Sequence, residues 1–265
     1  NDANYIPASL LYKSFKTMSV LASGAVVRQV LLSAGAEESQ IMAKLQPIAT
    51  DMHALGNPWI SYSVYLNNSF LPGLLQLMIL LVTVFSIGSE MKRATSREWL
   101  RTADDSIIIA ITGKLIPQTI IFFSMGLLYL SLLYGYLHFP MHNSIWHMIF
   151  AMFLLVVASQ SFAVIIMCFA PSLRIGLSVG GLVGVLSLSI AGFSFPVPAM
   201  YLPFQAISYV LPVRHYFLIY VDQALNGIPL YYSRVHYVAL ILFAVASTPL
   251  LPRLKKALMR QVYVP

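Results

Sequence analysis

Long apolar runs separated by short polar loops dominate the chain from residue 70 onward. A helix needs about 20 predominantly apolar residues to cross a bilayer core of about 30 Å. We expect a membrane-spanning helix in each of five runs: residues 70–88, 107–136, 145–169, 175–195 and 235–251. The pattern therefore predicts an all-α, multi-pass membrane protein with a transmembrane domain over residues 58–265.

The first 57 residues differ from the rest because charged residues interrupt each apolar run. Apolar residues recur there at helical spacing, and Gly24 and Gly35 divide them into short stretches. We therefore expect short amphipathic surface helices rather than spans. Residues 1–57 would form part of an extracytoplasmic, mainly helical domain.

An apolar but proline-rich segment, residues 196–222, separates the fourth and fifth expected spans. Proline inside a helix removes a hydrogen bond and clashes with the preceding turn, so one straight span is disfavoured. Broken backbone at membrane depth must be buried within protein. The segment is therefore predicted to be a re-entrant pair of short helices, interrupted at Pro196, Pro198, Pro203 and Pro212.

Basic residues indicate the orientation, because cytoplasmic loops carry an excess of Lys and Arg. They concentrate in the loop of residues 89–106 and in the C-terminal tail: Lys92, Arg93, Arg97, Arg101, Arg253, Lys255, Lys256 and Arg260. Both segments are expected in the cytoplasm and residues 1–57 outside. An external first segment also suggests a preceding span, absent from this sequence, which would bring the whole protein to six.

Composition supports a lipid environment. Of the 265 residues, 58% are hydrophobic and 9% are charged, whereas a soluble domain carries about 25% charged residues. The net charge of +7 lies mostly beside apolar runs, so we expect no nucleic-acid partner. The single cysteine, Cys168, lies in an apolar run and is expected to be a small buried hydrophobe.

The most informative loop is residues 89–106, where Trp99 and Leu100 stand among Arg97, Glu98 and Arg101. A short amphipathic helix between two spans can lie at the interface and present its polar side to a cytosolic partner. The alternative is a solvated loop, since charge runs are usually solvated faces.

The span that follows this loop opens with Gly113, Lys114 and Pro117. We expect Lys114 to snorkel to the interface, with a direct contact role as the alternative, and Pro117 to kink the helix. Before this span, an acidic residue of the Asp104–Asp105 pair is expected to cap the helix.

Small and polar residues within the later spans suggest close helix contacts. Gly176, Gly180 and Gly184 form two overlapping G-x-x-x-G steps, which let helix backbones approach closely. They would pack either within the subunit or across a dimer. Gln160 lies mid-span and is expected to make an interhelical hydrogen bond, with lining of a substrate path as the alternative.

Catalytic and metal-binding motifs are weak in this sequence. His138 and His142 have the spacing of helical metal ligands, but Pro140 lies between them, so no metal site and no catalytic residue is predicted. No G-x-S-x-G sequence occurs. No G-x-x-x-x-G-K-[ST] sequence occurs either, so the chain does not bind nucleotide phosphates by that route.

The segment from Glu90 to Pro117 resembles the coupling region of ABC-2 type permeases. In that family an acidic residue and a basic run lead to a short E-x-L-like helix, and a G-K-x-x-P element opens the next span. Asn57-Pro58, Tyr62 and Pro72-Gly73 also resemble the N-P-x-x-x-Y…P-G lead into the family's second span, which corresponds to the first expected span here. Phe195-Pro196 through Pro212 resembles the family's F-P to L-P segment before its last span. This sequence departs from the family pattern in having Ala94-Thr95 where Gly-Thr is usual.

The resemblance implies a type V exporter-like helix bundle acting as the permease subunit of a bacterial inner-membrane exporter, similar to multidrug exporters. Two permease subunits, identical or different, would form the pathway, and a separate ABC ATPase would supply ATP and Mg²⁺, with no cofactor in this chain. A periplasmic adaptor is a further expected partner beside the lipid bilayer. The implied ATPase-coupling residues are Glu90, Arg97, Glu98, Trp99, Leu100 and Arg101, and the implied external gate is Phe195, Pro196, Pro198, Pro203 and Pro212.

Two other functions stay open from the residues alone: a membrane-embedded enzyme, and an assembly protein without transport. The cargo is also open, since aromatic and Met-rich spans suit hydrophobic molecules and equally face lipid in any membrane protein.

Overall fold

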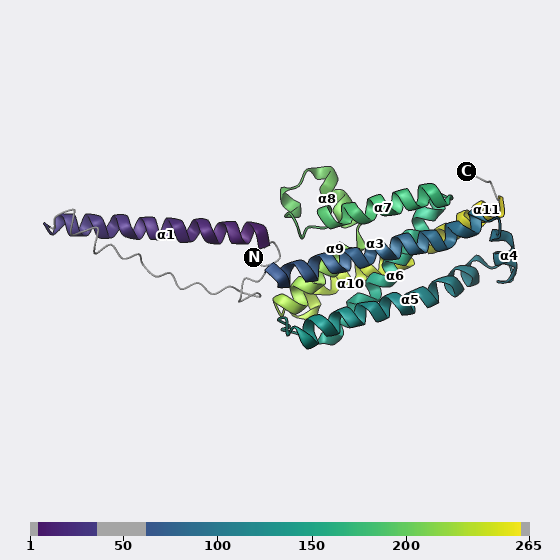
Figure 1. Ribbon diagram of the computed structural model, residues 1–265, viewed down its shortest axis with the longest axis horizontal. Coiled ribbons are helices and arrows are strands. Elements are labelled where there is room, and N and C mark those ends of the chain that lie inside the picture. Colours follow the sequence, from purple (N-terminus) through teal and green to yellow (C-terminus); the bar gives the residue numbers. More distant parts are fainter. Residues whose placement is uncertain (1–4, 36–61, 261–265) are drawn as a thin grey trace.

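A computed structural model describes residues 5–35 and 62–260, and every regular element in these ranges is helical. The bundle consists of long helices joined by short turns, with α1 standing apart from it (Figure 1). The long helices of the bundle are α3 (Tyr62–Lys92), α5 (Ile107–Leu130), α6 (Ile145–Phe169), α7 (Leu173–Ile190) and α10 (Leu230–Val245).

Six helices among the described residues are long and apolar enough to cross a membrane. Two of them, Ile107–Tyr136 and Ile145–Phe169, have the bounds that the apolar runs predict. The first of these is α5 continued by a π-helical stretch, η2 (Ser131–Tyr136). The helical prediction of an all-α multi-pass membrane protein is confirmed.

The sixth candidate lies in α1 (Tyr5–Ser33), where the sequence analysis expected short surface helices. The helix runs through Gly24 without a break, because a single glycine costs an interior position only about 1 kcal/mol. Length and composition alone would let Leu10–Ser33 cross a membrane. The expected third short helix of this segment, and Asn57-Pro58, lie outside the described residues.

The centre of the bundle is α6, which packs against α3, α5, α7, α9 and α10. Its buried residues lie on all its faces and are mostly apolar, as expected of a helix surrounded by others. Gln160 lies at its middle; the Thr119 hydroxyl donates to Oε1 of Gln160 at 2.7 Å. This contact is the interhelical hydrogen bond expected for Gln160, and it joins α5 to α6.

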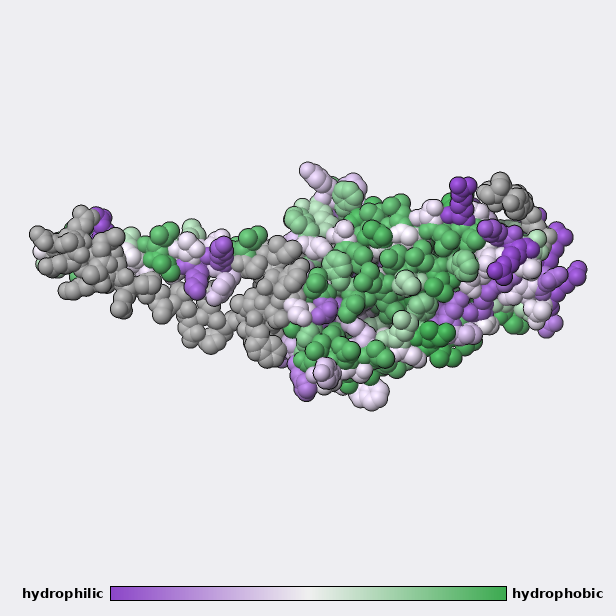
Figure 2. Space-filling view, in the orientation of Figure 1, coloured by the Kyte–Doolittle hydropathy of each residue, from purple (hydrophilic) through white to green (hydrophobic). Residues whose placement is uncertain are grey.

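The outer surface carries the apolar residues that would face lipid. On α5, Ile116, Ile120, Ile121 and Leu128 are all more than half exposed. Figure 2 shows hydrophobic residues over the middle of the bundle and hydrophilic ones gathered at the end where α4 (Ser96–Arg101) and α11 (Leu251–Arg260) lie. We call this end, with its exposed Arg97, Arg101, Arg253 and Lys256, the basic end.

At the opposite end the chain is broken into short helices. These are η3 (Val197–Ala199), α8 (Leu202–Tyr209), α9 (Pro212–Tyr220) and η4 (Val221–Leu225). Proline fits the first turn of a helix, where its missing N–H has no intrahelical partner. Pro198, Pro203 and Pro212 each stand in the first turn of η3, α8 or α9, so the prolines set where these helices begin.

Two helices end earlier than their apolar runs predict. Helix α7 ends at Ile190 rather than residue 195, and Gly192 follows with φ +102°, a left-handed conformation that favours glycine. Helix α10 ends at Val245 rather than residue 251 and also begins earlier, at Leu230. A short turn containing η5 (Thr248–Leu250) then leads into α11.

Candidate functional site

The loop between α3 and α5 folds into the short helix α4 at the basic end (Figure 1). Leu100 is fully buried, in a cluster that includes Ile87 of α3, Ile107 of α5 and Leu254 of α11. Glu98 and Arg101 are exposed. The helix is therefore amphipathic, with one residue anchored among three other helices and a charged face directed to solvent.

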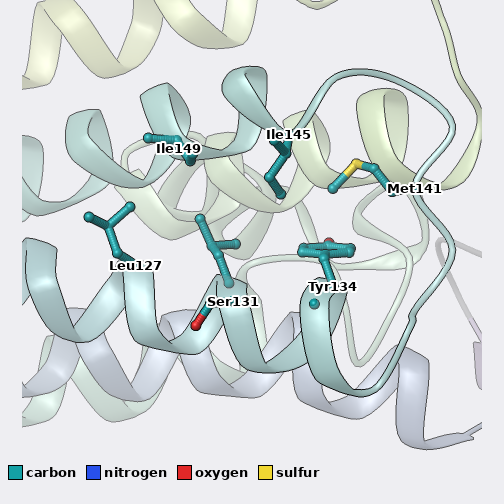
Figure 3. Close-up of a pocket in the computed structure, with 8 residues that line it drawn as sticks. Leu127, Ser131, Tyr134, Met141, Ile145 and Ile149 are labelled. Atoms are coloured by element: carbon teal, nitrogen blue, oxygen red, sulfur yellow. The ribbon is translucent and has the colours of Figure 1, made fainter.

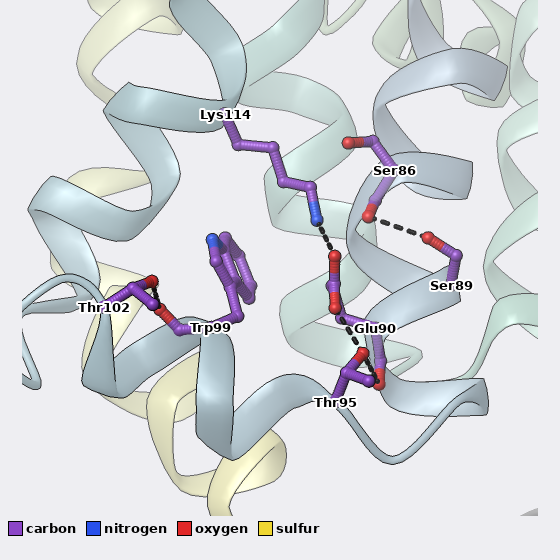
Figure 4. Close-up of polar contacts among 7 residues, drawn as sticks. All are labelled: Ser86, Ser89, Glu90, Thr95, Trp99, Thr102 and Lys114. Atoms are coloured by element: carbon purple, nitrogen blue, oxygen red, sulfur yellow. Dashed lines mark hydrogen bonds and ion pairs between the residues drawn. The ribbon is translucent and has the colours of Figure 1, made fainter.

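An ion pair lies directly beside α4. Nζ of Lys114 on α5 is 2.6 Å from Oε1 of Glu90 on α3. The Lys114 side chain is 19% exposed and the Glu90 side chain 25%. Figure 4 shows Lys114 reaching down from α5 to this carboxylate. Lys114 therefore has an ionic partner on the neighbouring helix, and its snorkelling to the membrane interface stays a prediction.

Two further contacts tie this pair to the loop. The Thr95 hydroxyl donates to the other carboxylate oxygen of Glu90, and the Thr95 amide donates to the Glu90 carbonyl at 3.0 Å. Nζ of Lys114 also lies 4.4 Å from the ring centroid of Trp99, a cation–π contact (Figure 4). Thr95 and Trp99 therefore contact the ion pair that joins α3 to α5.

The turn into α4 contains a residue in an unusual conformation. Ala94 has φ +58°, in the left-handed region that costs an L-residue roughly 1–2 kcal/mol and costs glycine little. This is the position where the ABC-2 pattern usually has glycine before threonine. The backbone thus keeps the conformation that suits glycine, although the side chain here is a methyl group.

The turn out of α4 has two consecutive residues in the left-handed region, Asp104 and Asp105, with φ +50° and +57°. Aspartate tolerates this region better than most residues. Helix α5 is capped by Ser106, whose hydroxyl accepts the amide of Ile109 at 3.5 Å. The expected capping by the acidic pair is therefore wrong, and these residues form the turn.

The C-terminal helix α11 packs along α4, a contact that the sequence did not predict. The Ser96 hydroxyl donates to the Leu258 carbonyl at 2.9 Å, and Nη2 of Arg97 donates to the Met259 carbonyl at 3.0 Å. These are last-turn carbonyls, which lack partners within their own helix. Part of Arg97 is thus used inside the chain, and the spacing of Leu251, Leu254 and Leu258 was the signal for this amphipathic helix.

Gly113 and Pro117, the other two residues expected near the start of the span after α4, face outward. Gly113 and Pro117, four residues apart, are both exposed on α5. A Cβ added at Gly113 would meet nothing within 4 Å. Neither residue takes part in the ion pair, so only Lys114 of the three belongs to the site at the basic end.

The glycines of α7 face α3 within the same chain. A Cβ at Gly184 would lie 3.1 Å from Cβ of Leu77, and one at Gly176 would lie 2.9 Å from Val84. At Gly180 the nearest atom would be 3.7 Å away, an ordinary contact. Close packing here joins α7 to α3.

At the opposite end, Phe195, Pro198 and Pro203 are exposed, whereas Pro212 is buried. The buried start of α9 is held by Gln76 of α3, whose Oε1 accepts the Val213 amide at 2.9 Å. Nη1 of the adjacent Arg214 donates to the Ala191 carbonyl at the end of α7, at 3.1 Å. The residues implied as an external gate therefore divide into an exposed hairpin around α8 and an anchored base at α9.

A cavity of about 570 Å³ also opens at this end, between α5–η2 and α6. Figure 3 shows Leu127 and Tyr134 on one side of it and Ile145 and Ile149 on the other. The lining is mostly aliphatic, so the cavity suits an apolar group. Tyr134 turns its hydroxyl away to Asn68 Oδ1, 3.0 Å distant.

The bundle, with six helices long and apolar enough to cross a membrane among the described residues, defines a multi-pass membrane protein. The sequence model of the ABC-2 family transporter proteins matches residues 1–251. The chain belongs to this family, and it is a membrane permease of an ABC transporter, the transport component rather than the ATPase. Searches of curated proteins and of solved structures return no match.

Proposed function

We propose that the basic end is cytoplasmic and that α4 is the coupling helix on which the ABC ATPase docks. The observation that carries this proposal is the division of α4 into a fully buried Leu100 and an exposed Glu98 and Arg101. The exposed charges would contact the ATPase. The anchored leucine would pass the movement into the bundle.

The path of the force would run through the Glu90–Lys114 pair. When ATP binding closes the ATPase subunits, a push on α4 moves Trp99 and Thr95, both of which contact this pair. The pair connects α3 to α5, so both helices would shift together. ATP and Mg²⁺ would be held by the partner, and this chain would hold no cofactor.

The outward gate would lie at the opposite end. The exposed hairpin that contains Phe195, Pro198 and Pro203 would move, and the base of α9, held by Gln76 and Arg214, would stay with α3 and α7. A second permease subunit, identical or different, would complete the pathway between the two chains. A periplasmic adaptor would bind at this end.

By the positive-inside rule, the basic end would lie on the cytoplasmic side of a bacterial inner membrane. Residues 1–57, including α1, would then lie outside, and the C-terminal α11 would lie in the cytoplasm. No group of three His, Cys, Asp or Glu side chains that could bind a metal occurs within the described ranges. No observation in those ranges favours an enzyme over a permease.

The proposal can be tested with the permease and its ATPase reconstituted together in nanodiscs. Reversing both exposed charges, Glu98→Lys with Arg101→Glu, is expected to weaken ATPase binding at least tenfold. Arg234→Glu, an exposed charge at the opposite end, is the control and should leave binding unchanged. If the double variant bound and stimulated the ATPase like the wild type, α4 would not be the docking helix.

A further inference from the structure

A second polar feature of the basic end is a cavity of about 320 Å³ between the last turns of α3 and the start of α7. It is lined by Phe85, Ser89, Lys92, Arg93 and Leu173. None of these residues belongs to the docking face of α4. The coupling function therefore leaves this cavity without a role.

The lining changes in character along one face of α3. Ser89, Lys92 and Arg93 lie four, seven and eight residues after Phe85, a spacing that places residues on one side of a helix. Arg93 directly follows the last residue of α3. The aromatic ring lies toward the middle of the span and is 52% exposed. The hydroxyl and then the two cations follow toward the helix end. An amphiphile with an apolar tail and an anionic head would match this order.

The cavity is bounded by two backbones in direct contact. A Cβ at Gly88 would lie 2.9 Å from the Leu173 Cα, so α3 and the first residue of α7 touch beside it. The first turn of α7 is fixed by Ser172, whose hydroxyl accepts the Ile175 amide at 3.3 Å. A helix N-terminus carries partial positive charge, which adds to the two cations.

Charge balance at this place also favours an anion. Neither Lys92 nor Arg93 forms an ion pair among residues 5–35 and 62–260, although Arg93 lies within electrostatic reach of Glu90. The Glu90 carboxylate already binds Lys114 and Thr95. Cations at the end of α3 also offset its helix dipole, but that role requires no cavity.

We propose that this cavity binds the phosphate headgroup of an anionic phospholipid from the leaflet at the basic end. Lys92 and Arg93 would hold the phosphate. Ser89, whose hydroxyl donates to the Ser86 carbonyl at 3.1 Å, would line the cavity beside it (Figure 4). The acyl chains would run past Phe85 along α3. Binding there would brace the contact between α3 and α7 at Gly88. Inorganic phosphate has the same charged group as the lipid headgroup, so the test must distinguish binding of the lipid from binding of free phosphate.

The test is native mass spectrometry of the purified, delipidated chain titrated with dioleoyl phosphatidylglycerol. We expect one binding event to be tighter than the rest and to weaken about tenfold or more in Lys92→Gln with Arg93→Gln. Dioleoyl phosphatidylcholine should bind more weakly than phosphatidylglycerol. Inorganic phosphate should not compete at millimolar concentration.

Two further sets of variants distinguish lipid binding in the cavity from a general effect of positive charge at the basic end. Arg253→Gln with Lys256→Gln removes two exposed charges from α11 at the same end and should leave the tight event in place. Ser89→Trp keeps both cations but fills the cavity and should abolish that event, and Ser89→Leu serves if the tryptophan variant does not fold. Equal losses in both charge pairs, no loss in the Ser89 variants, or displacement by inorganic phosphate would each overturn the proposal.

Discussion

The ammonium of Lys114 and the carboxylate of Glu90 lie 2.6 Å apart and join α5 to α3 beside the loop helix α4. Because both groups are largely buried, each depends on the other to offset the loss of hydration. The same two residues contact Trp99 and Thr95, which flank or belong to α4. The pair thus lies where the docking helix meets the spans.

Removing one partner of this pair should destabilise the protein and uncouple it. Lys114→Met is expected to lower stability by about 1–2 kcal/mol, between the values for an exposed and a fully buried pair. It should also reduce ATPase stimulation. Thermal unfolding and stimulated ATP hydrolysis are the measurements.

The control is the exchanged pair, Lys114→Glu with Glu90→Lys. Recovery of part of the lost stability and stimulation in the double variant would show that the two charges act on each other. Losses that simply add would mean that the contact carries no coupling.

The left-handed conformation at Ala94 predicts a stabilising substitution. Ala94→Gly relieves the strain of φ +58° but gives the unfolded chain more freedom, so we expect a net gain of about 1 kcal/mol and a melting temperature about 2–4 °C higher. Ala103→Gly, at a nearby buried alanine without positive φ, should lower it. A decrease in both variants would contradict the assignment.

Glycine substitutions in two helices should differ in sign. Gly184→Ala drives a methyl group against Leu77 of α3 and should destabilise by about 1–3 kcal/mol, as overpacking does. Gly113→Ala meets open space and should stabilise by up to about 1 kcal/mol through helix propensity. Denaturation of the two purified variants measures both, and equal effects would contradict the close approach of α7 to α3.

Leu258 and Met259 are adjacent on the C-terminal helix α11 but differ in burial. Leu258 is fully buried against α4 and its surroundings, so Leu258→Ala should cost about 2–5 kcal/mol and loosen α4. Met259 is 46% exposed and its carbonyl contact with Arg97 is unaffected by truncation, so Met259→Ala should change stability by less than about 0.5 kcal/mol. Similar losses in both would mean that α11 does not pack on α4.

Local patterns predicted much of this fold because bilayer thickness sets helix length and hydropathy directly. The spans at residues 107–136 and 145–169 needed no tertiary information. The expectation of several short helices was wrong for residues 5–33, because the charged residues and Gly24 do not break α1. The Lys114–Glu90 contact and the packing of α11 on α4 depend on which helices are neighbours, and residues 24 or more positions apart leave no periodic signal of that.

The location of α1 can be decided by cysteine labelling in a Cys168→Ser background. Our proposal places α1 outside, so an impermeant maleimide added to intact cells should react with cysteines at both Lys13 and Ser33, which are exposed. A reaction at position 33 and none at position 13 would show instead that α1 crosses the membrane.

In the proposed transporter, the charged face of α4 contacts the ATPase. The most direct measurement is site-specific cross-linking of the assembled transporter, with a cysteine at Glu98 or Arg101 in the Cys168→Ser background and a control cysteine at Tyr201, exposed at the opposite end. We predict cross-links to the ATPase from positions 98 and 101 and none from 201. Co-purification of the ATPase with no cross-link from either α4 position, or accessibility of position 98 to reagent outside the cell, would contradict the claim.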